Sequence, residues 1–174
     1  MKILIQLSHP AHFHLYKNVA KALLHNGHQV FVIIKTKDIL EDLCKEARLP
    51  YSNINVHAHR GSKFGILLDL LMRDMRIAGI CIKHHIQLLT GSTPEVAHVG
   101  WLMHIPSINT GEDDAAVVPL YVKIAGKFIK CLLTPMVCNN GLMNEVSVKY
   151  PSFHELAYLH PNHFTPNKEM VEKY

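Results

Sequence analysis

The sequence predicts a Rossmann-like, doubly wound parallel sheet in a three-layer α/β/α arrangement. Short apolar segments rich in β-branched residues alternate with amphipathic segments of helical spacing, and short turns join them. At least five such strand–helix units can be counted, and crossovers between parallel strands are almost always right-handed. The 174 residues are too few for an eight-unit barrel, which needs about 250.

The first half of the chain is predicted to hold three strands and three helices. Pro10 suits the first turn of a helix, where its missing N–H leaves no partner unpaired. Asn26-Gly27 supplies the left-handed residue that ends this helix. The predicted strands are Lys2–Leu7, His28–Lys35 and Tyr51–Val56, and the predicted helices are Ala11–His25, Lys37–Arg48 and Lys63–Lys83.

The third predicted helix has a broad apolar face that we expect to pack on the sheet. This face includes Phe64, Leu67, Leu68, Leu71, Met75 and Ile80. Contact with a membrane surface is a weaker alternative, based on the basic residues Arg73, Arg76 and Lys83 of the same helix.

The second half continues the alternation of strands and helices. Thr93 and Pro94 are predicted to cap and begin a helix that reaches about His104. Glu112, Asp113 and Asp114 are predicted to open another helix, because acids in a first turn complement the helix dipole, and that helix should reach about Lys127. The predicted strands are Ile86–Leu89, Pro106–Asn109, Ile129–Thr134 and a short one at Val146–Lys149.

The chain divides into a Rossmann-like domain over residues 1–150 and a connecting segment over residues 151–174. The segment contains three prolines and shows no strand pattern. We expect it to lead toward a carboxyl-terminal nucleotide-sugar domain that is absent from this chain. Apolar surface exposed near it would allow oligomers to form.

Composition excludes several classes of protein. The formal net charge of +4 comes from scattered basic residues, so no nucleic-acid-binding arm is predicted. The four cysteines form no C-x-x-C pair, which favours reduced thiols in a cytoplasmic protein. The amino-terminal apolar run is too short for a signal peptide. The sequence contains no run of about 18 apolar residues, so no membrane span is predicted.

The candidate site lies in three turns. In an open parallel sheet, ligands bind at the carboxyl ends of the strands, where the strand order reverses. With the order 3-2-1-4-5, this point falls between the first and fourth strands. The turns after strands one, four and five are SHPAH, TGSTP and TGEDD.

The first of these turns is predicted to hold a phosphate, a carboxylate or a developing alkoxide at a helix amino terminus. Ser8 and His9 are its candidate substrate ligands, and His12 is a candidate general base toward a sugar hydroxyl. The alternative is that Ser8 only caps the helix and that the histidines are solvated.

The other two turns supply small residues and acids. Gly91, Ser92 and Gly111 are candidate substrate contacts, because small residues let a ligand approach the backbone. Glu112, Asp113 and Asp114 are candidates for a general base as well as for helix-dipole partners. Arg60 and Gly61, in the loop before the third helix, are further candidate substrate ligands.

We expect no metal and no cofactor. His9 and His12 are spaced to converge, but the local sequence fixes no third zinc ligand. No G-x-G-x-x-G follows the first strand, which disfavours dinucleotide binding, and the sequence has no phosphate-binding P-loop.

The start of the chain, MKILIQLSHPAHFHLYKNVAKALLHNGHQV, resembles the family called domain of unknown function 354. The later segments SINTGEDDAAVVPLY, LLTPMVC and FHELAYLHPNHFTP resemble it as well, so the similarity covers essentially the whole chain. That family is similar to glycosyltransferases of the GT-B architecture and to UDP-N-acetylglucosamine 2-epimerases, which place two Rossmann-like domains around a cleft.

The resemblance implies that this half carries the acceptor contacts and part of the catalytic apparatus. His12 lies about where a lipid-linked disaccharide transferase of this architecture has a histidine in its glycine-rich first turn. Ser8, His9 and Ala11 replace glycines of that turn. The epimerases carry an arginine in that turn and this chain does not, which lowers the epimerase hypothesis.

Three functions follow from these observations. The first is a glycosyltransferase half that acts with a nucleotide-sugar donor on a cell-surface, lipid-linked or other glycan acceptor and is inactive as an isolated chain. The second is an enzyme similar to UDP-sugar 2-epimerases. The third is a non-catalytic module that binds a glycan or a partner protein.

Overall fold

The computed structural model describes residues 1–35, 38–54 and 63–172. Its strands are β1 Lys2–Leu7, β2 Gln29–Ile34, β3 Tyr51–Asn53, β4 Leu88–Gly91, β5 Ser107–Thr110, β6 Leu132–Pro135 and β7 Ser147–Tyr150. All are parallel and form one sheet in the order β3-β2-β1-β4-β5-β6-β7. The order reverses between β1 and β4, so the predicted doubly wound, Rossmann-like sheet is confirmed.

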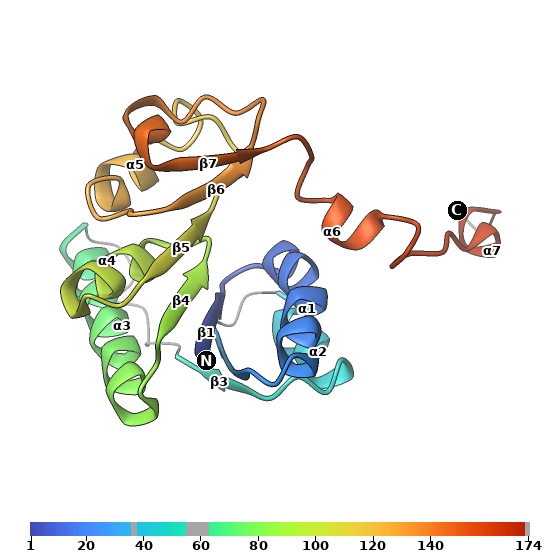
Figure 1. Ribbon diagram of the computed structural model, residues 1–174, viewed down its shortest axis with the longest axis horizontal. Helices are drawn as coiled ribbons and strands as arrows, with labels where there is room; N and C mark the ends of the chain where they lie inside the picture. The colour runs from blue at the N-terminus through green and yellow to red at the C-terminus, as the bar shows by residue number, and fades with distance from the viewer. Residues whose placement is uncertain (36–37, 55–62, 173–174) are drawn as a thin grey trace.

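Helices cover both faces of this sheet (Figure 1). They are α1 Pro10–His25, α2 Leu40–Glu46, α3 Lys63–His84, α4 Pro94–Met103, α5 Pro119–Ala125, the 3₁₀ helix η1 Gly141–Val146, α6 Leu156–Leu159 and α7 Lys168–Glu172. One core cluster joins β1 and β2 to α1 and α2, and a second joins the opposite face to α3 and α4. The three-layer arrangement predicted from the sequence is therefore present.

Strand β1 shows why the central strands read as continuous apolar runs. Ile3, Ile5 and Leu7 face α1 and α2, whereas Leu4 faces α3 and α4. All four side chains are buried, because both faces of the strand are covered.

The helix predicted to open at Glu112 begins seven residues later, at Pro119. In a helix running from residue 112, Pro119 would lie in the interior, where it lacks an N–H and its ring clashes with the preceding turn. At the first helical position the missing N–H costs no hydrogen bond, and there is no preceding turn for the ring to clash with. The prediction that the three acids open a helix is therefore wrong, and residues 111–118 form a loop instead.

The expected packing face of α3 is largely wrong. Phe64, Leu67, Leu71 and Met75 are exposed, Phe64 to 75%. Ile77 and Cys81 are buried in the core instead, and of the expected face Ile80 packs against them. The helix is apolar on two sides, so spacing alone does not identify the buried one. Among the described helices, none is both long and apolar enough to cross a membrane.

The segment after β7 folds back toward the first helix before the chain ends. The Asn18 side-chain amide in α1 donates to the Ala157 carbonyl in α6 over 3.0 Å. The rings of His14 and Tyr158 lie 5.4 Å apart between their centroids. Figure 1 shows α6 beside α1 and the chain continuing outward to α7.

Two glycines inside helices should respond in opposite ways to alanine. A Cβ at Gly100 in α4 would lie 2.6 Å from Ser107 Cβ on β5, whereas a Cβ at Gly79 in α3 would meet nothing within 4 Å. We expect Gly100→Ala to lower the free energy of unfolding by about 1–3 kcal/mol through overpacking. Gly79→Ala should raise it by up to about 1 kcal/mol through helix propensity. Urea denaturation measures both, and a neutral Gly100→Ala would contradict the close packing of α4 on β5.

Candidate functional site

The three predicted turns meet at the carboxyl edge of the sheet around a cavity of about 180 Å³. From these turns and the first turn of α1 the cavity is lined by Ala11, His12, Ser92, Thr110, Gly111, Glu112 and Asp113. Other elements contribute Leu15, Val118, Tyr121, Leu132, Asn140, Met143, His154 and Tyr158. The predicted gathering of the turns is confirmed, while the chemical roles of their residues stay predictions.

The turn after β1 is held by its own histidines. His9, rather than Ser8, is the N-cap of α1, and its Nδ1 accepts from the Ala11 N–H over 3.2 Å. His12 Nδ1 lies 3.4 Å from the Ser8 backbone N and 3.3 Å from Ser8 Oγ. His12 lines the cavity, whereas Ser8 and His9, the candidate substrate ligands of this turn, are not among its lining residues.

A chain of hydroxyl groups connects α1 to the ends of β4 and β5. The buried Tyr16 hydroxyl lies 2.8 Å from Thr90 Oγ1 and 3.3 Å from Thr110 Oγ1. Thr110 Oγ1 in turn hydrogen-bonds Ser92 Oγ at the cavity. Burial raises the pKa of Tyr16, and burial raises the pKa of Tyr121 in the cavity wall to about 12. Both phenols are therefore protonated at neutral pH and cannot serve as general bases.

The glycines of the turns differ in what surrounds them. A Cβ at Gly91 would lie 2.7 Å from the Gln6 carbonyl oxygen, so β1 occupies the space that this glycine leaves. Gly111 lines the cavity, and a Cβ there would lie 3.3 Å from Leu132 Cδ1. Arg60 and Gly61, the two other predicted ligands, lie outside the described residues.

The three acids of the third turn separate. Asp113 lines the cavity. Asp114 Oδ1 accepts from the Asn139 backbone N–H over 2.7 Å, which ties the loop to the segment after β6. Glu112 Oε2 lies 3.1 Å from His154 Nδ1, and both residues line the cavity. Of the three acids, Glu112 and Asp113 line the cavity and Asp114 does not.

His154 is the functional candidate that sequence reasoning missed. Its side chain is 9% exposed and stacks on Tyr150 at an interplanar angle of 11°. It lies 42 residues from its partner Glu112 in the sequence. The sequence predicts only a connecting segment around it. Nothing local in the sequence indicates that this connection returns across the carboxyl edge of the sheet.

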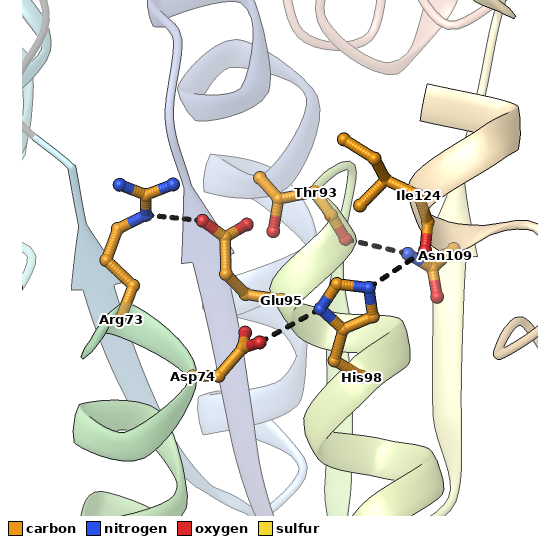
Figure 2. A network of polar contacts seen from close by, with 7 residues as sticks. All are labelled: Arg73, Asp74, Thr93, Glu95, His98, Asn109 and Ile124. Carbon is orange, nitrogen blue, oxygen red and sulfur yellow. Dashed lines mark hydrogen bonds and ion pairs between the residues drawn. The ribbon is translucent and has the colours of Figure 1, made fainter. Parts of the chain in front are cut away.

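A polar network fixes the start of α4 (Figure 2). Arg73 Nε donates to Glu95 Oε1 over 2.6 Å, and the Asn109 side-chain amide donates to the Thr93 carbonyl over 3.0 Å. His98 lies between Asp74 Oδ2 at 2.9 Å and the Ile124 carbonyl at 3.1 Å. These contacts hold α3, α4 and α5 together and so position the turn that carries Ser92.

The described residues hold no cluster of three or more His, Cys, Asp or Glu side chains arranged for a metal ion. The cavity's described lining also contains no lysine and no arginine, but does contain Glu112 and Asp113. Its charged side chains therefore disfavour a bound diphosphate and suit a neutral ligand with hydroxyl groups.

No family model and no curated protein matches the sequence. The resemblance to domain of unknown function 354 thus stays a prediction. Solved structures do match. MurG from Acinetobacter baumannii is 15% identical, with a TM-score of 0.59 over 86% of this chain and 44% of that chain.

Two further structures show the same partial overlap. A glycosyltransferase from Rickettsia africae is 16% identical, with a TM-score of 0.62 over 99% of this chain and 49% of that chain. The UDP-GlcNAc 2-epimerase from Neisseria meningitidis, bound to UDP-GlcNAc, is 13% identical, with a TM-score of 0.61 over 78% of this chain and 40% of that chain. This chain spans less than half the length of each of these proteins, and at these identities the shared property is the Rossmann-like fold.

Proposed function

We propose that this chain is the acceptor-side half of a glycosyltransferase that uses a nucleotide-sugar donor. The observation that carries the proposal is the carboxyl-edge cavity, which combines two imidazoles, two carboxylates and a chain of hydroxyl groups. Carboxyl edges at the point of strand reversal are where open α/β sheets bind ligands. Two of the similar structures are transferases, MurG and the rickettsial enzyme, which supports this choice.

In the proposed reaction, the cavity holds the hydroxyl-bearing acceptor. A side chain of the cavity, either an imidazole or a carboxylate, removes the hydroxyl proton as the oxygen attacks the anomeric carbon of the donor. The donor's diphosphate is held by a second domain, because the acidic cavity lining does not suit it. The site operates without a metal or cofactor in this proposal.

The epimerase alternative has one observation in its favour. An epimerase bound to UDP-GlcNAc shares the fold, and Glu112 with His154 supplies an acid–base pair of the kind that proton abstraction at a sugar carbon requires. A glycan-binding module without catalysis uses the same cavity and differs only in the absence of turnover.

One incubation separates the three functions. A longer protein that carries residues 1–174 together with a nucleotide-sugar domain is incubated with a panel of UDP- and GDP-sugars, with and without glycan acceptors. Transfer that requires an acceptor supports the glycosyltransferase, and isomerisation without an acceptor supports the epimerase. Saccharide binding without turnover supports the binding module. Turnover by the 174-residue chain alone would contradict the proposed division of labour.

A further inference from the structure

We propose that His154 is the general base of the cavity and that Glu112 is a positioning residue that fixes the tautomer of its ring. This assignment rests on the proposed function and extends it, because it names which group takes the acceptor proton. The three turns supplied His12 and the acids as candidates, whereas His154 comes from the segment after β7.

The proton on His154 is placed by its partner. An ionised carboxylate only accepts hydrogen bonds, so Glu112 Oε2 at 3.1 Å requires that Nδ1 carry the proton. The neutral ring then has its lone pair on Nε2. In the described part of the chain, Nε2 is buried and has no hydrogen-bond partner, and the residue lines the cavity. A histidine that only fastened this segment would be expected to use both nitrogens.

The ring of His12 carries its proton on the other nitrogen. The Ser8 backbone N–H points at His12 Nδ1 over 3.4 Å, and a backbone N–H can only donate. The neutral ring of His12 therefore carries its proton on Nε2, which makes that nitrogen a donor. Of the two histidines that line the cavity, His154 has the tautomer of a base and His12 that of a hydrogen-bond donor.

In the proposed reaction, one proton moves to His154 and one glycosyl group moves to the acceptor. The acceptor hydroxyl gives its proton to His154 Nε2 while its oxygen forms a bond to the anomeric carbon of the nucleotide sugar. The bond from that carbon to the diphosphate oxygen breaks, and a nucleoside diphosphate leaves with the electron pair. The Glu112 carboxylate, at 3.1 Å from Nδ1, stabilises the imidazolium. Since Nε2 is buried, acceptor binding has to displace the wall of the cavity around it.

The first test is the tautomer itself, measured on the 174-residue chain by ¹⁵N NMR of the histidine rings. The pH is raised until the same spectra show that the rings have lost their extra proton, so that neutral tautomers are compared. His9 and His160 are internal references, since their Nδ1 atoms accept from backbone N–H groups and their protons must lie on Nε2. We expect His154 to show the opposite pattern, and a proton on Nε2 of His154 would overturn the proposal.

Two variants refine this measurement. Glu112→Ala removes the acceptor and should move the His154 proton to Nε2, while Asp113→Ala removes a neighbouring acid of equal charge and should leave it on Nδ1. An unchanged spectrum in Glu112→Ala would overturn the role of Glu112. The wild-type spectrum decides the question by itself if either variant does not fold.

The second test is kinetic and uses whichever protein carrying this chain shows transfer. His154→Gln should lower kcat by about 10²–10⁴-fold, the usual contribution of a general base. His12→Gln should act mainly on KM. A His154→Gln variant within a few-fold of wild type would overturn the base assignment. If no donor in the panel supports transfer, the proposed function fails, while the NMR result still decides whether Glu112 and His154 form the predicted pair.

Discussion

Arg73→Met is expected to lower the free energy of unfolding by about 3–5 kcal/mol, the usual cost of removing one partner from a buried ion pair. The Arg73 side chain is 13% exposed and its partner Glu95 only 5%. Without the guanidinium, the Glu95 carboxylate would remain buried between α3 and α4 without its ion-pair partner. Urea denaturation of the variant at neutral pH measures the loss.

A surface pair provides the matched control. Lys45 contacts Glu41 at 3.4 Å and Asp42 at 3.8 Å but is 59% exposed. Lys45→Met should therefore change the free energy of unfolding by no more than about 1 kcal/mol. The double variant Arg73→Met/Glu95→Met should recover most of the loss, because it leaves no uncompensated charge. Equal effects of Arg73→Met and Lys45→Met on the free energy of unfolding would contradict the expected cost of leaving the Glu95 charge unpaired.

The sheet was predictable because its signals are local and repeated. Strands β1 and β2 are buried on both faces and are correspondingly rich in apolar residues, and the turns between elements are marked by Gly91, Pro94 and Gly111. The strand-reversal rule then placed the three chemically rich turns at one edge. The position of the cavity follows from these patterns without any long-range information.

The errors arise where two local signals compete or where the contact is distant. The acids at 112–114 favour a helix start, but Pro119 determines it, because proline is tolerated in the first turn and not in the interior. The α3 helix has two apolar sides, and only the packed structure shows that Ile77, and not Met75, meets the sheet. The pairing of Glu112 with His154 depends on the return of the chain after β7, which no periodic pattern encodes.

The stability of the protein should fall as the pH rises through the pKa of His98, and Asp74 should be the cause. Both ring nitrogens of His98 lie at acceptors, the Asp74 carboxylate at 2.9 Å and the Ile124 carbonyl at 3.1 Å. Both therefore donate, which requires the imidazolium. The hydrogen bond with Asp74, together with that of the carbonyl, raises the pKa of His98 above its usual value although burial opposes this.

The sign follows from proton linkage. A raised pKa means that the folded state binds the proton more tightly than the unfolded state. The contribution of His98 is thus complete below the unfolded pKa of about 6.5 and is lost as the pH rises through the folded pKa. Burial raises the pKa of Asp74 as well, but that effect begins near the ordinary pKa of a carboxyl group, at acid pH. Within this pair, the loss of stability that begins near pH about 6.5 is therefore assigned to His98.

His98→Leu keeps an apolar side chain against Phe128, which contacts the imidazole edge to face, and removes two hydrogen bonds that involve charge. At a pH below about 6.5 it should cost about 3–6 kcal/mol, since each of the two bonds contributes about 1.5–3 kcal/mol. The difference from wild type should shrink at alkaline pH, where the wild-type imidazolium is lost. Asp74→Asn keeps the shape of the partner and removes its charge, so it should flatten the same pH dependence. Thermal unfolding of the three proteins across this pH range measures the effect, and a wild-type slope in Asp74→Asn would show that Asp74 is not what holds the proton on His98.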